Sequence, residues 1–274
     1  MNTPHPEFQD SDLEAAPRKP RKGLYVLPNL FTLAALFGGF YAIVMAMNGR
    51  FENAAIGIFC AMVLDSLDGR VARMTGTQSA FGEQMDSLSD MVSFGAAPAL
   101  VVYEWALKDL GRWGWIAAFV YCACAALRLA RFNTNIGVID KRFFQGLPSP
   151  AAAALVAGSL WLAVDAGWLP QEHPWLEWTM LGITLYAGLT MVTNAPFYSF
   201  KDFSLKRTVP FALLVGLVIL IALVASHTPI ALFALFCCYS LSGYLEYARR
   251  KWQGRHASLI ATSTDEPDEA GLHR

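Results

Sequence analysis

Apolar and polar residues follow each other along this chain in long blocks. Eight apolar stretches come after a polar leader, and each is about long enough to cross a hydrocarbon core of ~30 Å as an α-helix. Their approximate bounds are 27–47, 53–74, 82–103, 113–133, 149–165, 175–194, 208–226 and 229–247. Because a backbone surrounded by lipid must satisfy its own hydrogen bonds, the pattern predicts an all-α fold, a polytopic membrane bundle of about eight transmembrane helices.

The basic residues indicate how these helices are oriented. If the N-terminus is cytoplasmic, 18 of the 21 Lys and Arg residues fall on the inside, and only Arg50, Lys108 and Arg112 fall outside. Lys and Arg are enriched in the cytoplasmic loops of membrane proteins. We therefore expect both termini in the cytoplasm and the protein in the cell (inner) membrane.

Composition narrows the class of protein further. The chain is 55% hydrophobic and only 16% charged, which is untypical of a soluble domain, and its net charge of −1 gives no basic field for nucleic acid. All five cysteines lie inside apolar stretches with no histidine nearby, so they are expected to be small hydrophobic residues rather than zinc ligands. They are Cys60, Cys122, Cys124, Cys237 and Cys238.

Four segments are expected along the chain. Residues 1–23 form a polar, partly basic cytoplasmic leader, and residues 24–200 form a core of six transmembrane helices. Residues 201–250 add two more transmembrane helices. The polar, acid-containing residues 251–274 form a cytoplasmic tail that is expected to be disordered.

Four aspartates interrupt the second and third apolar stretches near their expected cytoplasmic ends. Asp65 and Asp68 share one helix face, and so do Asp86 and Asp90. Two antiparallel helices with a short connection would present all four carboxylates to each other. Like charges at that depth repel strongly, and a divalent cation would compensate them. All-oxygen ligation suits Mg²⁺, Mn²⁺ or Ca²⁺ rather than zinc, and a pair of such ions is typical of phosphoryl chemistry.

Small residues and one arginine accompany these aspartates. Gly69, Ala72 and Gly82 leave room for a ligand phosphate to approach the helices. Arg73 offers that phosphate a bidentate contact. Each feature has a structural alternative, since glycine often serves helix packing and arginine often anchors a cytoplasmic helix end. A structural role does not account for the four aspartates together.

The order and spacing of these residues resemble the signature of the CDP-alcohol phosphatidyltransferase family without departure: Asp65-x-x-Asp68-Gly69-x-x-Ala72-Arg73, then eight residues, then Gly82-x-x-x-Asp86-x-x-x-Asp90. The resemblance covers roughly residues 24–200. It implies a membrane enzyme, expected to be a homodimer, that transfers a phosphatidyl-type group from a CDP-linked lipid to an alcohol and releases CMP.

The resemblance also implies roles for single residues. Asp65, Asp68 and Asp86 would be metal ligands for Mg²⁺ or Mn²⁺. Asp90 would be the general base and would also contact a metal ion. The CDP-lipid would be bound by Asn29, Thr32, Gly69, Ala72, Arg73 and Gly82, although Asn29 and Thr32 could equally cap a helix. A carboxylate base also agrees with the positions of the histidines, which all fall in tails or outside loops. They are His5, His173, His227, His256 and His273.

Stretches outside the signature resemble the branch of this family whose acceptor is L-serine, which implies CDP-diacylglycerol and L-serine as substrates. They are LPNLFT at 27–32, SDMVSFGAAPA at 89–99, ALRLARFN at 126–133 and FQGLPSPAAA at 144–153. Arg128 and Arg131 share a helix face and would hold the serine carboxylate. Asn133 and Ser149 would complete this pocket. As alternatives, the arginines anchor the helix end and Ser149 caps the fifth helix.

Three other functions stay open at this point. The acceptor could be another alcohol, such as glycerol 3-phosphate, inositol phosphate or choline, and a phosphorylated acceptor would need a larger basic cluster. A divalent-cation transporter would also carry acidic residues within the membrane, although the other apolar stretches contain no second group of acids along an ion path. A membrane scaffold would tolerate the loss of Asp68.

Overall fold

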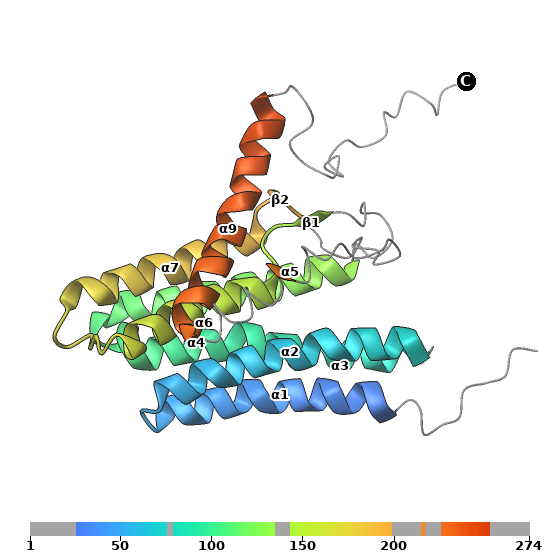
Figure 1. The fold of residues 1–274 in the computed structure, drawn as a ribbon, viewed down its shortest axis with the longest axis horizontal. Helices are drawn as coiled ribbons and strands as arrows, with labels where there is room; N and C mark the ends of the chain where they lie inside the picture. Colours follow the sequence, from blue (N-terminus) through green and yellow to red (C-terminus); the bar gives the residue numbers. More distant parts are fainter. Residues whose placement is uncertain (1–25, 76–78, 135–142, 199–214, 217–225, 253–274) are drawn as a thin grey trace, which may run out of the picture.

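The computed structural model describes residues 26–75, 79–134, 143–198, 215–216 and 226–252. Long helices run side by side through most of it, and the helix nearest the C-terminus crosses them at a steep angle (Figure 1). In chain order the helices are α1 (Val26–Met47), α2 (Phe51–Thr75), α3 (Ala80–Asp90), η2 (Met91–Ala96), α4 (Ala97–Val102), η3 (Tyr103–Leu107), η4 (Lys108–Leu110), α5 (Arg112–Thr134), α6 (Ser149–Asp165), α7 (Pro174–Val192) and α9 (Thr228–Trp252). The prediction of a helical protein is confirmed for these residues.

A tight turn joins α1 to α2. Gly49 adopts a left-handed backbone with a φ of 71°, a conformation that favours glycine. Its amide donates to the carbonyl of Ala46 at 2.9 Å, and the next amide, of Arg50, donates to Met45 at 2.9 Å. Such a pair of bonds ends a helix. The two helices then pack antiparallel, which brings the start of α1 to the end of α2.

The third apolar stretch forms a continuous helical path from α3 to η3, with π-helical turns at η2 and η3. Ser93 in η2 donates its hydroxyl to the carbonyl of Ala35 in α1 at 3.0 Å. Gly39 makes room for this approach, because a Cβ there would lie 2.6 Å from the Cα of Ser93. The sequence predicted one span here and did not indicate the π-helical turns, which frequently occur at functional sites.

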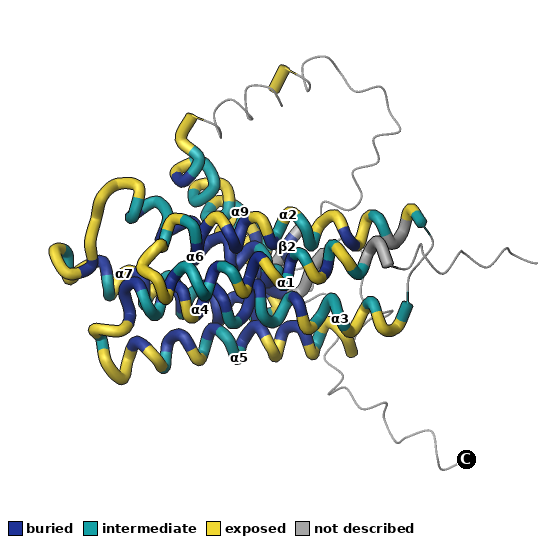
Figure 2. The backbone as a smooth tube through the Cα atoms, turned by 90° about the horizontal axis from the view of Figure 1, so that it is seen from below, coloured by how far each residue is buried: buried dark blue, intermediate teal, exposed yellow. Residues whose placement is uncertain are grey.

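Helix α6 forms the centre of the bundle. Residues 151–160 are all buried, and Figure 2 shows the buried segments gathered in the middle of the molecule. Alanine predominates in this run, so α2, α7 and α9 pack closely against it. Helices α5 and α7 approach each other in a similar way, since a Cβ on Gly188 would lie 2.9 Å from the Cα of Tyr121.

Two short strands add a feature that the sequence did not predict. Strands β1 (Phe143–Gln145) and β2 (Pro196–Tyr198) pair antiparallel, with Phe144 opposite Phe197. The amide of Gly146 donates to Ala195 at 2.9 Å, and the amide of Leu147 donates to Thr190 at 3.1 Å. The pairing ties the entry of α6 to the exit of α7. Three-residue strands carry too little pattern for a sequence prediction.

Three of the described helices are long and apolar enough to cross a membrane: Asn29–Met47, Arg112–Thr134 and Thr228–Arg249, with Ser149–Asp165 as a shorter apolar helix. Their outer faces expose large apolar side chains, among them Phe37 and Phe40 on α1 and Phe119 on α5, as expected for contact with lipid. The chain therefore has the character of a membrane protein. The predicted stretch 208–226 lies outside the described residues except for 215–216 and 226.

Candidate active site

Four carboxylates meet between α2 and α3. One carboxylate oxygen each of Asp65, Asp68 and Asp86 can be chosen so that all three lie within 4.8 Å of one another. The carboxylate of Asp90 lies next to that of Asp65. The structure thus brings together the four aspartates that the sequence singled out, because α2 and α3 both pack against α1 and each presents one acidic face.

Helix α1 supplies the hydrogen bond that orients Asp68. The hydroxyl of Thr32 donates to Oδ2 of Asp68 at 2.9 Å, and the two residues are only 3% and 6% exposed. The backbone carbonyl of Thr32 accepts a bond of 3.1 Å from the hydroxyl of Ser89. Thr32 therefore links α1 to both acid-bearing helices. Sequence reasoning missed Ser89, although its place directly before Asp90 was a usable signal.

Two oxygens in the cluster are buried without a hydrogen-bond partner among the described residues: Oδ1 of Asp86 and Oδ1 of Asp90. An unsatisfied buried polar group costs about 1–3 kcal/mol. A divalent cation would satisfy both oxygens and compensate the repulsion of four acids. The donor set is made of carboxylate oxygens alone, which suits Mg²⁺, Mn²⁺ or Ca²⁺. The residues present therefore fit a metal site.

The residues predicted to bind the CDP-lipid gather at the same end of the bundle. A Cβ on Gly82 would lie 3.5 Å from Oδ1 of Asn29 and 3.2 Å from Oγ of Ser79, so the starts of α1 and α3 are adjacent. Ser79 caps α3 by accepting a bond of 3.1 Å from the amide of Gly82. Gly69 is exposed on α2. The backbone of Ala72 and Arg73 continues this helix, and their side chains lie outside the described part of the structure.

Arg128 reaches the site from α5. Its side chain is buried, at 9% exposure, and Nη1 donates to the hydroxyl of Ser149 on α6 at 2.8 Å. The Nε of Arg128 has no hydrogen-bond partner among the described residues. The guanidinium also interacts electrostatically with Asp90. Arg128 and Ser149, predicted as one pocket, therefore lie together beside the proposed base.

Arg131 and Asn133 make different contacts. The guanidinium of Arg131 donates to the carbonyl of Val192 and to Oδ1 of Asn194, each at 3.2 Å, and so joins α5 to the end of α7. A basic side chain at a helix C-terminus is favourable because the last carbonyls lack partners within the helix. The amide of Asn133 donates to the hydroxyl of Ser87 on α3 at 3.0 Å. Both residues connect helices that surround the carboxylates.

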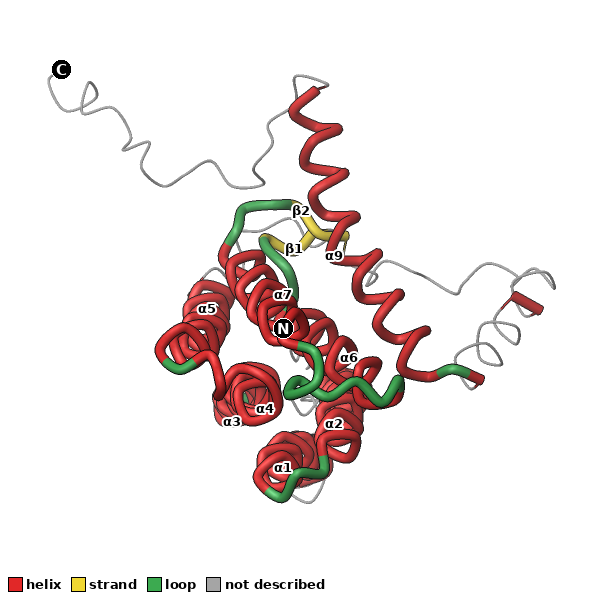
Figure 3. Tube along the Cα trace, turned by 90° about the vertical axis from the view of Figure 1, so that its left-hand side faces the viewer, coloured by secondary structure: helices red, strands yellow, loops and turns green. Residues whose placement is uncertain are grey.

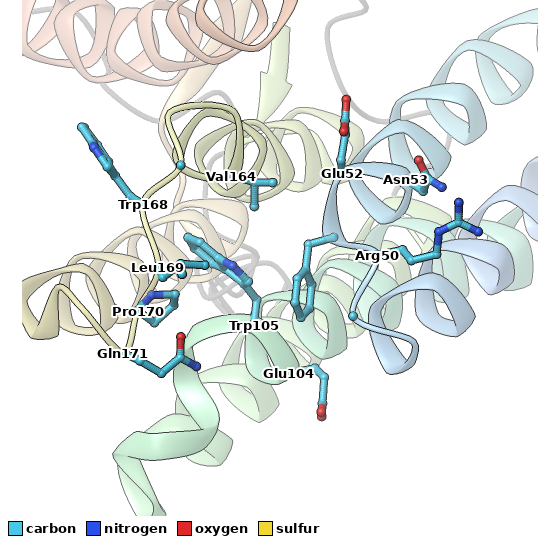
Figure 4. Close-up of a pocket in the computed structure, with 13 residues that line it drawn as sticks. Arg50, Glu52, Asn53, Glu104, Trp105, Val164, Trp168, Leu169, Pro170 and Gln171 are labelled. Carbon is cyan, nitrogen blue, oxygen red and sulfur yellow. The ribbon is translucent and has the colours of Figure 1, made fainter.

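A cavity of about 530 Å³ lies at the opposite end of the bundle (Figure 4). It is formed where the α1–α2 turn, η3 and the segment after α6 meet, and its lining includes Phe51, Trp105 and Trp168. Phe51 and Trp105 are in edge-on contact, with ring centroids 6.5 Å apart. Phe51 is roughly 20 Å along α2 from Asp65. The cavity is therefore separate from the carboxylate site and contains none of the predicted site residues.

The fold and the site define a helical membrane protein that carries, at one end of its bundle, a cluster of carboxylates that could hold a metal ion. Residues 25–193 match the family model named CDP-alcohol phosphatidyltransferase. The match covers more than half of the chain, and the protein belongs to this family. The resemblance that the aspartate spacing indicated is thereby confirmed.

Curated relatives are similar to part of the chain. A CDP-diacylglycerol–serine O-phosphatidyltransferase of Helicobacter pylori is 38% identical over 182 residues, which cover 66% of this chain and 76% of the relative. One of the same name from Mycobacterium leprae is 40% identical over 164 residues, covering 57% of this chain and 54% of the relative. An archaetidylserine synthase of Methanothermobacter thermautotrophicus is 38% identical over 133 residues, covering 48% and 56%.

Proposed function

We propose that the protein is an integral membrane enzyme of phospholipid synthesis that transfers the phosphatidyl group of CDP-diacylglycerol to L-serine, giving phosphatidylserine and CMP. The observation that carries this proposal is the carboxylate cluster of Asp65, Asp68 and Asp86, with Asp90 and Arg128 beside it. The names of the relatives support serine as the acceptor.

Asp65, Asp68 and Asp86 would hold the divalent cations, Mg²⁺ or Mn²⁺, and Asp90 would contribute to the same site. When bound, such ions neutralise the diphosphate of the donor and stabilise charge on the attacking and leaving oxygens. Thr32 fixes the orientation of Asp68 through its 2.9 Å hydrogen bond. A ligand held in one orientation needs no rearrangement when the ion binds.

Asp90 is the proposed general base. It would accept the proton of the serine hydroxyl while that oxygen forms a bond to the lipid-bearing phosphorus and the bond from this phosphorus to the CMP oxygen breaks. A carboxylate oxygen of Asp90 that does not contact a metal ion would accept this proton. A divalent cation bound beside Asp90 would favour the carboxylate form that the step requires.

The remaining predicted residues surround these groups. Asn29, Gly69, Ala72, Arg73 and Gly82 would bind the cytidine and diphosphate of CDP-diacylglycerol, with Arg73 as the bidentate phosphate contact. Arg128 would hold the serine carboxylate and Ser149 would position the guanidinium. Arg131 and Asn133 would keep the helices around the acceptor in place.

The membrane arrangement is part of the same proposal. The charge asymmetry and the family support eight transmembrane helices in the inner membrane, with both termini and the active site on the cytoplasmic face. They also fit a homodimer. Residues 24–200 would form the catalytic core, 201–250 two added spans, and 1–23 and 251–274 the polar ends. Exposed tryptophans support a membrane–water interface at the end of the bundle opposite the aspartates. They are Trp113, Trp115, Trp168, Trp175 and Trp178.

Purified protein in detergent with labelled L-serine, CDP-diacylglycerol and Mn²⁺ or Mg²⁺ tests the proposal. We expect metal-dependent labelling of lipid together with CMP release, and the loss of both in Asp68→Asn. Release of CMP only with another alcohol, such as glycerol 3-phosphate, would show a different acceptor. Metal-independent labelling, or full activity of Asp68→Asn, would contradict the site.

A further inference from the structure

Helix α9 lies beyond residue 193, where the family match ends, and it packs along α6 and beside the strand pair (Figure 3). One of its tyrosines, Tyr239, is half-buried on the face that points toward β2. The sequence offered no role for this helix other than a membrane span. Its side chains nevertheless reach the surroundings of Arg128.

Two hydrogen bonds fix α9 against α7. The hydroxyls of Tyr244 and Thr190 lie 2.8 Å apart, and the hydroxyl of Tyr186 donates to Ser240 at 3.5 Å. Tyr239 lies within this stretch of α9, directly before Ser240. These contacts set both the rotation and the height of the helix, so the position of the Tyr239 side chain follows from them.

Phe197 of β2 connects α9 to the entry of α6. Its buried ring lies between two tyrosines of α9, with centroids 5.8 Å from Tyr239 and 6.4 Å from Tyr244. Gly243 admits this ring, because a Cβ there would collide with it. Tyr239 and Gly243 are four residues apart and so share one face of α9. Phe197 in turn pairs with Phe144 of β1, from which the chain continues through Gly146 to α6.

Arg128 of α5 is the basic residue near Tyr239. Its guanidinium interacts electrostatically with the hydroxyl of Tyr239 as well as with Asp90. It donates to Ser149 through Nη1, while its buried Nε has no hydrogen-bond partner among the described residues. A buried donor without a partner indicates a place where a ligand oxygen would be bound. Tyr239, Arg128 and Asp90 therefore border one polar region inside the bundle.

We propose that Tyr239 is a specificity-determining residue of the acceptor pocket, whose phenolic hydroxyl donates a hydrogen bond to the carboxylate that Arg128 binds. This inference rests on the proposed function, since it takes the acceptor to be an amino acid. A guanidinium and a phenol together recognise a carboxylate by charge and by direction. An alcohol without a carboxylate would leave the Nε of Arg128 unsatisfied and would be rejected.

The test compares Tyr239→Phe with the wild type in detergent. The substitution keeps the ring that packs on Phe197 and removes only the hydroxyl. We expect the KM for L-serine to rise about tenfold, because a hydrogen bond to a charged group is lost. The KM for CDP-diacylglycerol should change less than twofold. Discrimination between L-serine and 2-aminopropane-1,3-diol, which lacks the carboxylate, should fall by a similar factor.

Tyr244→Phe is the matched control. It removes a hydroxyl from the same helix, but one that bonds to Thr190. The Tyr186–Ser240 bond and the packing of Tyr239 on Phe197 still hold α9 in place, so the KM for L-serine should stay at the wild-type value. Thermal unfolding with and without L-serine measures binding independently of turnover and shows whether each variant is folded.

Three outcomes separate the possibilities. A folded Tyr239→Phe with an unchanged KM and unchanged stabilisation by serine would overturn the inference. An equal rise in KM for Tyr244→Phe would also overturn it, because general displacement of α9 would then explain the effect. If the wild type forms no phosphatidylserine, the proposed function itself fails, and this is seen before any variant is compared.

Discussion

Helices α1, α2 and α3 bring four carboxylates together, whereas α5, α6 and α9 surround a single buried guanidinium with hydroxyl groups. We refer to these as the acidic half and the basic half of the site. In the acidic half, acceptor oxygens of Asp86 and Asp90 lack partners among the described residues, which suits a cation. In the basic half, Arg128 donates a hydrogen bond to Ser149. Its Nε has no hydrogen-bond partner among the described residues, which suits an anion.

The two halves also differ in how far apart their parts lie in the sequence. The aspartates fall within residues 65–90, on two consecutive helices. The basic half combines Arg128 with Ser149, which is 21 residues further on, and with Tyr239 near the end of the described chain. We infer that the proposed metal site would be defined by two consecutive helices, while the proposed selectivity for the acceptor would depend on residues from the whole bundle.

Replacement of the proposed base should give the largest effect. In Asp90→Asn the side chain keeps its shape but accepts no proton, so kcat should fall about 10²- to 10⁴-fold. Turnover and Mn²⁺ binding by calorimetry would be measured together, since a role confined to metal ligation would lower affinity instead. Asp165→Asn, at an exposed position on α6, is the control and should retain activity. If Asp90→Asn turned over at the wild-type rate, the proposed role of Asp90 as general base would be contradicted.

Arg128→Lys should affect the basic half alone. Lysine keeps the charge but loses the planar guanidinium that bonds to Ser149, so the KM for L-serine should rise about 10- to 100-fold. The KM for CDP-diacylglycerol and the affinity for Mn²⁺ should stay at their wild-type values. Arg112→Lys, exposed at the start of the same helix, provides the control. If Mn²⁺ affinity falls as much as serine affinity, the two halves are not separable.

Thr32→Val should affect the acidic half alone. Valine is similar in shape but cannot donate to Asp68, and loss of a group that orients a metal ligand should weaken Mn²⁺ binding about tenfold. Thr184→Val removes another buried hydroxyl, whose bond to Met180 stays within α7, and should leave the metal affinity unchanged. Equal losses in the two variants would indicate general destabilisation rather than ligand orientation.

The same contrast explains what the sequence could and could not predict. Regular spacing on neighbouring helices was enough to identify the four aspartates and to expect them in one place. The pairing of Arg128 with Ser149 was proposed as a pocket from the resemblance, and the structure brings the two into contact. For Arg131, the sequence suggested a serine ligand or a topology anchor, and the contacts with the end of α7 came from tertiary structure.

Features that depend on packing between distant segments were not predictable. The π-helical turns at η2 lie where Ser93 contacts α1, and no local pattern encodes that contact. The strand pair needs residues 143–145 and 196–198 to meet. The position of Tyr239 depends on Phe197, Gly243 and two hydrogen bonds to α7, so hydropathy alone showed α9 only as a span.

Gly39→Ala should give the smallest effect on turnover, and it shows how far the acidic half depends on helix packing. A Cβ at this position would lie 2.6 Å from the Cα of Ser93, so α1 and η2 must separate, at a cost of about 1–3 kcal/mol. Thermal unfolding in detergent would measure the loss, and Gly182→Ala, where a Cβ meets nothing within 4 Å, is the control. Because Thr32 and Ala35 of α1 contact Ser89 and Ser93, separation here should weaken Mn²⁺ binding before it affects the KM for L-serine. A rise in that KM with unchanged Mn²⁺ affinity would instead place this helix contact in the basic half.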